Sequence, residues 1–98
     1  MSYIDKARER LAYELPGTSN VLLDLYTLLV FTRGWMVTSE DVHDAWAIWR
    51  SRTDPSHRSL VPFCELDEEV QALDVKYADA IAKVAASLRE DLDGRFDA

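Results

Sequence analysis

The sequence predicts a mainly α fold, with four helices and one irregular docked loop in a single small domain. The chain has 98 residues, which is enough for one hydrophobic core but not for two. Only three glycines and three prolines interrupt it, so few turns separate the longer segments. Along those segments apolar residues recur three or four positions apart, the spacing of one helix face. We therefore expect one domain over residues 1–98.

Composition and charge exclude several classes of protein. The net charge of −7 argues against a protein that coats DNA or an anionic membrane, because such surfaces are bound through Lys and Arg. No uncharged apolar run approaches the roughly 18 residues of a membrane span, and the N-terminus lacks the pattern of a signal peptide. The one cysteine, Cys64, cannot form an internal disulfide. We expect a cytoplasmic protein.

Two helices are expected in the first third of the chain. Ser2 with Asp5 forms a variant of the capping box that opens the first helix, and Pro16-Gly17 ends it. A second helix begins at residues 19–20 and runs to Gly34, where glycine can take the left-handed closing conformation. Its sequence is apolar almost all round, so we expect it to be the central element.

The third helix has a well-marked start. Thr38 and Asp41 form a capping box, which places the first helical residue at Ser39. The helix is expected to end before residues 53–55, because proline disfavours helical geometry in the residue that precedes it.

The rest of the chain is expected to hold an extended segment and one long helix. Residues 55–65 contain two prolines and the apolar run LVPF, and predict a segment docked on the helices. Asp67 is expected to cap the last helix, and residues 92–98 to fray. The predicted core stripe of this helix is Val70, Leu73, Tyr77, Ile81, Val84, Ala85 and Leu88.

The third helix carries two tryptophans with different expected roles. At about 100° per residue, Trp49 shares the core face with Val42. Trp46 lies at the border, with His43 and Arg50 on its polar flank. Trp46 is either structural, with its indole N–H bonded to His43 or a backbone carbonyl, or a stacking wall for a planar ligand.

Basic residues gather near the end of the third helix and predict a candidate anion or phosphate site beside Trp46. The alternative is that Arg50 and Arg52 only complement the dipole of the helix end. The candidate ligand-binding residues are His43, Trp46, Arg50, Arg52, His57 and Arg58.

The sequence contains no signature of a metal site or of catalysis. His43, His57 and Cys64 lack the short paired spacings of structural zinc sites. There is no glycine-rich phosphate loop, no G-x-S-x-G and no carboxylate pair with a clear acid and base. We therefore expect no metal, no cofactor and no enzymatic activity.

The run VHDAWA at residues 42–47 is followed in order by Arg50, His57, Leu60-Val61-Pro62-Phe63, Leu66 and Asp74. This order resembles the signature of the ryanodine-receptor repeat (RyR) domain, over about residues 38–85. The chain departs from it in having only a short linker, residues 51–56, where the family has a longer insertion. Arg58 stands where the family has proline, and Val75 where it has arginine. The whole chain also resembles small proteins of actinobacteria and their phages.

The RyR resemblance implies a helical fold and a binding role. Tandem RyR repeats pack around a pseudo-twofold axis, so a chain with a single copy is expected to homodimerise. Microbial RyR domains are linked with the sensing of nucleotide-derived signals. The first hypothesis is therefore a non-enzymatic domain that binds a nucleotide-like anion, with Trp46 against the base and arginines on the phosphate. In a phage protein it would sequester a defence signal in the host cytoplasm.

The alternative hypothesis is a protein-interaction module that binds and modulates a host protein. Its basis is the surplus negative charge together with the apolar LVPF segment at residues 60–63, if that segment is partly exposed. The competing interpretation of LVPF is that it plugs the helical core.

Overall fold

The computed structural model describes the backbone of residues 2–96 and the side-chain surroundings of residues 2–91. Over the described backbone the protein is all α, with four helices of 12 to 22 residues and no strand. The predicted fold class is confirmed. The long helices are α1 (Tyr3–Glu14), α2 (Asn20–Thr32), α3 (Ser39–Thr53) and α5 (Val75–Phe96), and a short helix α4 (Glu68–Ala72) precedes the last one.

Local signals in the sequence set the ends of α1 and α2. The Asp5 N–H donates to the Ser2 hydroxyl at 3.1 Å, and the Ser2 N–H donates to the Asp5 carboxylate at 3.3 Å. The Ser19 hydroxyl accepts from a backbone N–H in the first turn of α2. Gly34, with φ of 57°, lies just beyond the end of α2 in the left-handed conformation. The predicted starts and stops are confirmed.

Helix α3 begins at Ser39 as predicted, with Thr38 as its N-cap. Thr38 and Asp41 form the reciprocal bonds of a capping box, and Arg33 donates to the Asp41 carboxylate at 2.9 Å. Burial alone would raise the pKa of Asp41, but the bonds from Thr38 and Arg33 outweigh it and lower that pKa. The ionised carboxylate therefore ties the end of α2 to the start of α3.

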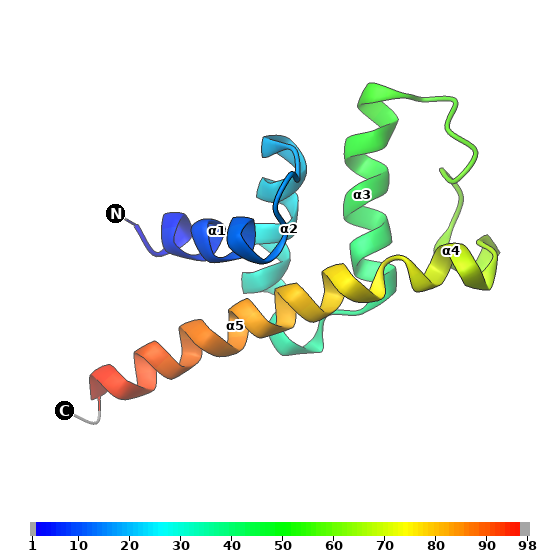
Figure 1. Ribbon diagram of the computed structural model, residues 1–98. Coiled ribbons are helices and arrows are strands. Elements are labelled where there is room, and N and C mark those ends of the chain that lie inside the picture. The colour runs from blue at the N-terminus through cyan, green and yellow to red at the C-terminus, as the bar shows by residue number, and fades with distance from the viewer. Residues whose placement is uncertain (1, 97–98) are drawn as a thin grey trace.

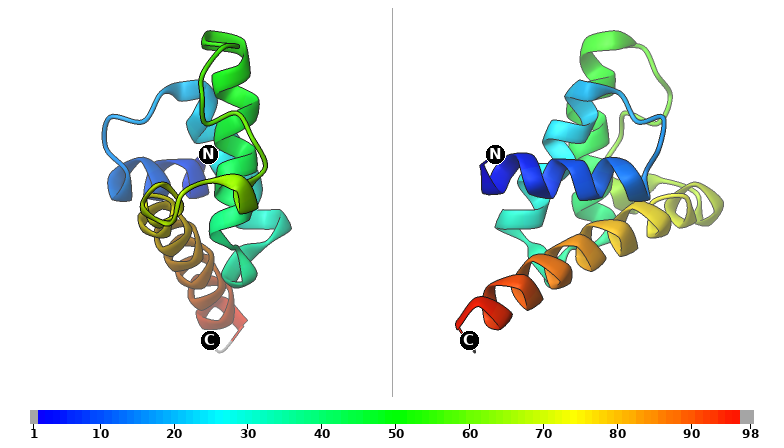
Figure 2. Two further views of the ribbon diagram at one scale, coloured as in Figure 1. Left: turned by 90° about the vertical axis from the view of Figure 1, so that its right-hand side faces the viewer. Right: turned by 60° about the vertical axis from the view of Figure 1, so that its left-hand side comes forward.

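The core lies where α5 crosses the other long helices. Helix α5 runs obliquely against α1, α2 and α3, which Figure 1 shows from one side and Figure 2 from two others. Lys83 pairs with Glu14 at 2.9 Å, and Arg10 pairs with Asp91, so polar contacts also join α1 to α5. The buried apolar residues are Ala7, Leu11, Leu15, Leu22, Leu23, Tyr26, Val30, Val42, Ala45, Ala78, Ala80, Ile81 and Val84.

The predicted long last helix is split in two. Residues 73–74 form a turn between α4 and α5, and the Asp67 side chain makes no capping bond. The Gln71 amide donates to the backbone carbonyls of Phe63 and Leu66, at 2.9 and 3.1 Å. These bonds fix α4 against the preceding segment, away from the axis of α5. Leu73 is consequently 67% exposed, and its assignment to the core stripe is wrong.

The segment between α3 and α4 is irregular, as predicted, and contains one short 3-10 turn, Phe63–Glu65. It leaves the end of α3 and returns to α4 as a wide arc, at the right of Figure 1. The frayed end predicted for residues 92–98 begins within α5, whose backbone is helical to Phe96. Residues 97–98 lie outside the described part of the chain.

Candidate functional site

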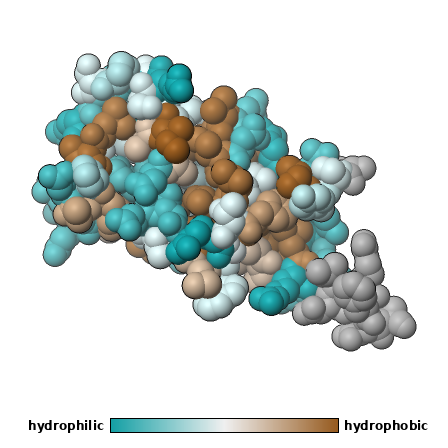
Figure 3. Space-filling model, turned by 180° about the vertical axis from the view of Figure 1, so that it is seen from behind, coloured by the Kyte–Doolittle hydropathy of each residue, from teal (hydrophilic) through white to brown (hydrophobic). Residues whose placement is uncertain are grey.

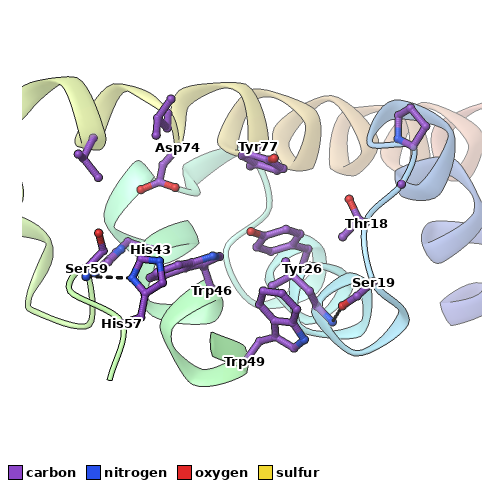
Figure 4. Close-up of a pocket in the computed structure, with 15 residues that line it drawn as sticks. Thr18, Ser19, Tyr26, His43, Trp46, Trp49, His57, Ser59, Asp74 and Tyr77 are labelled. Carbon is purple, nitrogen blue, oxygen red and sulfur yellow. Dashed lines mark hydrogen bonds between the residues drawn. The ribbon is translucent and has the colours of Figure 1, made fainter. Parts of the chain in front are cut away.

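A cavity of about 530 Å³ lies among the helices and the irregular segment. Its walls come from the α1–α2 connection, α2, α3, the irregular segment and the α4–α5 turn. Figure 4 shows side chains from these elements facing one space beneath the turn before α5. Small-molecule sites in proteins have volumes of about 300–1,000 Å³. The cavity is therefore large enough for a small organic ligand.

Aromatic rings form a large share of the wall. Tyr26 and Tyr77 face each other with ring centroids 5.6 Å apart. Trp46 stacks on His43 at 5.6 Å, with 26° between the planes, and meets the edge of His57 at 5.1 Å. Planar rings are attracted to such walls by stacking and edge-to-face contacts. The cavity thus favours a flat ligand.

His43 anchors the irregular segment from within the wall. Its Nε2 lies 2.7 Å from the Val61 carbonyl oxygen. Because that oxygen can only accept, Nε2 must carry the hydrogen, and Nδ1 of the neutral ring is an acceptor. The residue is only 3% exposed. The expected position of His43 on a free polar flank is wrong, since the docked segment covers that side of α3.

His57 is oriented by its own loop. The Ser59 N–H donates to His57 Nδ1 at 3.0 Å, the dashed line in Figure 4. The neutral ring therefore carries its hydrogen on Nε2. This places a donor at the end of the cavity that the irregular segment closes.

Several polar atoms in the wall have no protein partner. Among the side-chain hydrogen bonds of residues 2–91, none involves the Tyr26 or Tyr77 hydroxyl or the Trp46 indole N–H. Burial raises the pKa of Tyr26, and the charges of Tyr77 and Asp74 raise it further, so this phenol stays a neutral donor. Neither His43 nor a backbone carbonyl accepts from Trp46, contrary to the structural alternative for that residue. Trp46 is half-buried and lies as a wall of the cavity.

Asp74 brings a carboxylate to the aromatic wall. It lies in the turn between α4 and α5, and Figure 4 shows its oxygens directed into the space above His43 and Trp46. Within residues 2–91 its carboxylate has no hydrogen-bond or ion-pair partner. Burial raises the pKa of Asp74, and the nearby His43 partly opposes that rise. Burial therefore disfavours the ionised form of Asp74 at this position.

The arginines predicted for the site lie elsewhere. The Arg50 guanidinium lies 4.5 Å from the centre of the Trp49 ring and 6.0 Å from that of Trp46. Arg52 and Arg58 are exposed, and none of the three lines the cavity. The Arg50 guanidinium stacks on Trp49 and donates to the Thr53 hydroxyl at 3.4 Å. Of the six predicted residues, the structure brings His43, Trp46 and His57 together and leaves the arginines outside.

The wall residues that were not predicted include Tyr26, Trp49, Asp74 and Tyr77. Trp49, expected in the core, is half-buried and packs against the core while also lining the cavity. One available signal was Tyr26, the single tyrosine of the mostly apolar helix α2. A second was the spacing of Asp74 and Tyr77, three residues apart and thus on one helix face. The sequence did not show that Tyr26, Asp74 or Tyr77 would lie opposite Trp46.

Two further findings concern membrane-spanning helices and groups of metal-ligating side chains. Over the described residues, no helix combines the length and the apolar character needed to cross a bilayer. In the same part of the chain, no three side chains of the His, Cys, Asp and Glu types gather where a metal ion could be held.

Comparison with known proteins places the chain in a family. No curated protein and no solved structure matches it. A family model described as a domain of unknown function (DUF7701) matches residues 2–86. The match runs from the capping box at Ser2 through most of α5 and includes every residue of the cavity wall. The chain therefore belongs to the DUF7701 family.

Proposed function

We propose that this protein is a non-enzymatic binding domain whose aromatic cavity takes a planar, nucleotide-like ligand. The observation that carries the proposal is a cavity of about 530 Å³ with aromatic walls and polar atoms that find no partner in the described chain. These polar atoms are open to the cavity, so a ligand that enters it can bond them. A nitrogen heterocycle supplies both the flat surface and the hydrogen-bonding edge.

The ring arrangement supports binding of a base in particular. Trp46 offers one face beside the edge of His57, and Tyr26 and Tyr77 border the same space. Base stacking on an aromatic side chain is worth about 1–3 kcal/mol. The hydroxyls of the two tyrosines and the Trp46 N–H then provide directional contacts.

The charges in the cavity support a ligand whose phosphate stays outside. Asp74 is the one carboxylate among the residues that line it, and no lysine or arginine lines it. A phosphate inside would be repelled by Asp74 and would lack a cation to neutralise it. The base would therefore lie inside the cavity and the phosphate outside it. Binding of the phosphate by Arg50, Arg52 or Arg58 is not required.

The RyR resemblance over residues 38–85 supports the same class of ligand. The run that carries it includes three cavity residues, His43, Trp46 and His57. If the chain is phage-encoded, such a domain would hold a nucleotide-derived signal of the host in the host cytoplasm. The proposal needs no chemical step, because holding the signal would be sufficient.

Thermal-shift measurements with nucleosides and with mono-, di- and cyclic nucleotides test the proposal. A ligand present at 100 times its Kd stabilises the fold by about 2.7 kcal/mol. Trp46→Ala should abolish the shift. Trp35→Ala is the matched control, because Trp35 is 69% exposed and does not line the cavity. No shift with any of these compounds, or equal shifts in both variants, would show that the proposal is wrong.

The alternative proposal is a protein-interaction module. It is favoured by exposed apolar side chains near the end of α2 and in the turn after it, including Leu28, Trp35 and Met36. In the LVPF segment, Val61 and Pro62 are exposed while Leu60 and Phe63 are half-buried. On the face shown in Figure 3, apolar groups alternate with hydrophilic ones. A pull-down from host lysate should lose a bound protein with Trp35→Ala and keep it with Trp46→Ala.

Homodimerisation is a separate proposal, based on the pairing of RyR repeats and on the same exposed apolar side chains. A closed dimer uses one surface patch twice. Light scattering at increasing protein concentration should give twice the mass of the chain, and Trp35→Glu should return the mass to that of one chain. A single-chain mass at every concentration would exclude the dimer.

A further inference from the structure

The position of Asp74 suggests which base the cavity takes. The residue lies directly before α5, where an aspartate normally accepts a bond from an N–H two or three residues further on. Here the Asp74 carboxylate makes no such bond among the described residues. Only its backbone carbonyl takes part, accepting from the Ala78 N–H at 3.0 Å. The side chain is thus not used for capping, and its oxygens face the cavity (Figure 4).

A carboxylate in this position needs donors. It has two acceptor oxygens in one plane and binds best to two parallel N–H groups. Among the side-chain hydrogen bonds of residues 2–91 none reaches this carboxylate, and His43 Nε2 is used by the Val61 carbonyl. A bound molecule that enters the cavity can supply the two donors.

We propose that Asp74 is the specificity-determining residue of the cavity and selects a base with two adjacent N–H donors, as guanine has in its ring N–H and 2-amino group. This inference rests on the proposed function, since it concerns the ligand of the same cavity. Trp46 supplies the stacking face and Asp74 the contacts at the edge.

The other common bases fit a carboxylate less well. Adenine and cytosine present an amino donor next to a ring nitrogen that accepts, so one carboxylate oxygen would face a lone pair. Uracil presents a single N–H between two carbonyl groups. Hypoxanthine retains the ring N–H of guanine but lacks the 2-amino group. Guanine alone of these offers both donors to Asp74.

Calorimetric titration of the full chain with guanosine, inosine and adenosine measures this selectivity. Losing one of two charge-assisted hydrogen bonds weakens binding by about tenfold, so inosine should bind about tenfold more weakly than guanosine. Adenosine should bind more weakly still. If guanosine and adenosine bind equally, the role of Asp74 is wrong while the proposed function stands. If no nucleoside binds, both proposals fail.

Asp74→Asn distinguishes a specificity role of Asp74 from a purely structural one, because only a specificity role predicts a changed order of nucleoside affinities. The amide has one acceptor and one donor, the pattern that pairs with adenine. The variant should lose at least about tenfold in guanosine affinity and gain affinity for adenosine. Asp79→Asn is the matched control, because Asp79 is exposed on α5 and does not line the cavity. An unchanged order of nucleosides in Asp74→Asn would overturn the inference.

A guanidinium ion has the same pair of donors and also binds aromatic faces. Methylguanidine is therefore titrated in parallel. Binding of guanosine with weaker or no binding of methylguanidine supports a neutral base. Binding of methylguanidine without guanosine would show that the cavity takes an organic cation and that the guanine assignment is wrong.

Discussion

Two parts of the molecule differ sharply in how completely they bury their side chains. In the packed part, residues 3–45 and 78–91, apolar side chains of α1, α2, α5 and the start of α3 form the core. In the cavity part, residues 46–77, no described residue is fully buried, although this part contains two tryptophans. The cavity lies where the two parts meet.

The difference in burial indicates that the two parts have different roles, stability in the packed part and binding in the cavity part. Burial of apolar surface supplies most of the stability of a small domain, so the packed part is expected to hold the fold. The cavity part is joined to it by the packing of Trp46, Trp49 and Tyr77 against the core and by the bond from His43 to the Val61 carbonyl. Regions with little buried surface open at low free-energy cost and commonly contain binding sites. Four predictions test this division.

The largest effect is expected in the packed part. Ile81 is fully buried on α5, and Ile81→Ala should lower the free energy of unfolding by about 2–5 kcal/mol. Ile48 is 58% exposed in the cavity part, and Ile48→Ala should change it by less than about 0.5 kcal/mol. Urea denaturation of both variants measures the contrast. Equal losses would show that the two parts do not differ.

The next effect concerns the contact that joins the two parts. His43→Leu leaves the Val61 carbonyl without its donor, at a cost of about 1–3 kcal/mol. The irregular segment should loosen before the whole protein unfolds. Limited proteolysis should then cut at residues 54–59 in this variant sooner than in the unmodified chain. Unchanged protection there would mean that other contacts hold the segment.

A smaller effect separates the two helix starts. Thr38 caps α3 with hydrogen bonds, whereas the Asp67 side chain makes no capping bond to α4. Thr38→Ala should therefore cost about 1 kcal/mol, and Asp67→Ala clearly less. The comparison uses thermal melts of the two variants. A larger loss for Asp67→Ala would contradict the assignment of α3 as the better-fixed helix.

The smallest effect should be stabilising. The pKa of Asp74 is raised by burial, so the folded state favours the neutral carboxyl, and stability falls as pH rises through that raised pKa. Because water still reaches the group, Asp74→Asn should gain less than about 1 kcal/mol at neutral pH, or less than about 4–8 °C in Tm. The gain should vanish as pH falls below the ordinary value for aspartate.

Asp41 is the corresponding carboxyl in the packed part, and its effect on stability has the opposite sign to that of Asp74. Its pKa is lowered, so its contribution is present at neutral pH and is lost as pH falls through the lowered pKa. Asp41→Asn should therefore destabilise at neutral pH. Melts of both variants across the acid range check the signs. A stabilising Asp41→Asn, or a destabilising Asp74→Asn, would reverse the interpretation.

Much of the fold could be predicted because its signals are local. The capping boxes at Ser2 and Thr38, the glycine after α2 and the prolines after α3 each act within a few residues. The break at residues 73–74 could not be predicted, because it accompanies bonds from the Gln71 amide to two carbonyls of the irregular loop before α4, which no sequence signal marks. For the same reason Leu73 was assigned to the core.

The candidate site could likewise be predicted only in part. The spacing within α3 identified Trp46 as a border residue, and the sequence included His43 and His57 among the candidates. It could not show that His43 would be covered by Val61, or that Arg50 would stack on Trp49. The sequence alone determined the first three helices, where they start, and one amphipathic face. Only the tertiary structure decided that Asp74, Tyr77 and Tyr26 meet Trp46, because contacts between distant segments depend on how the helices pack.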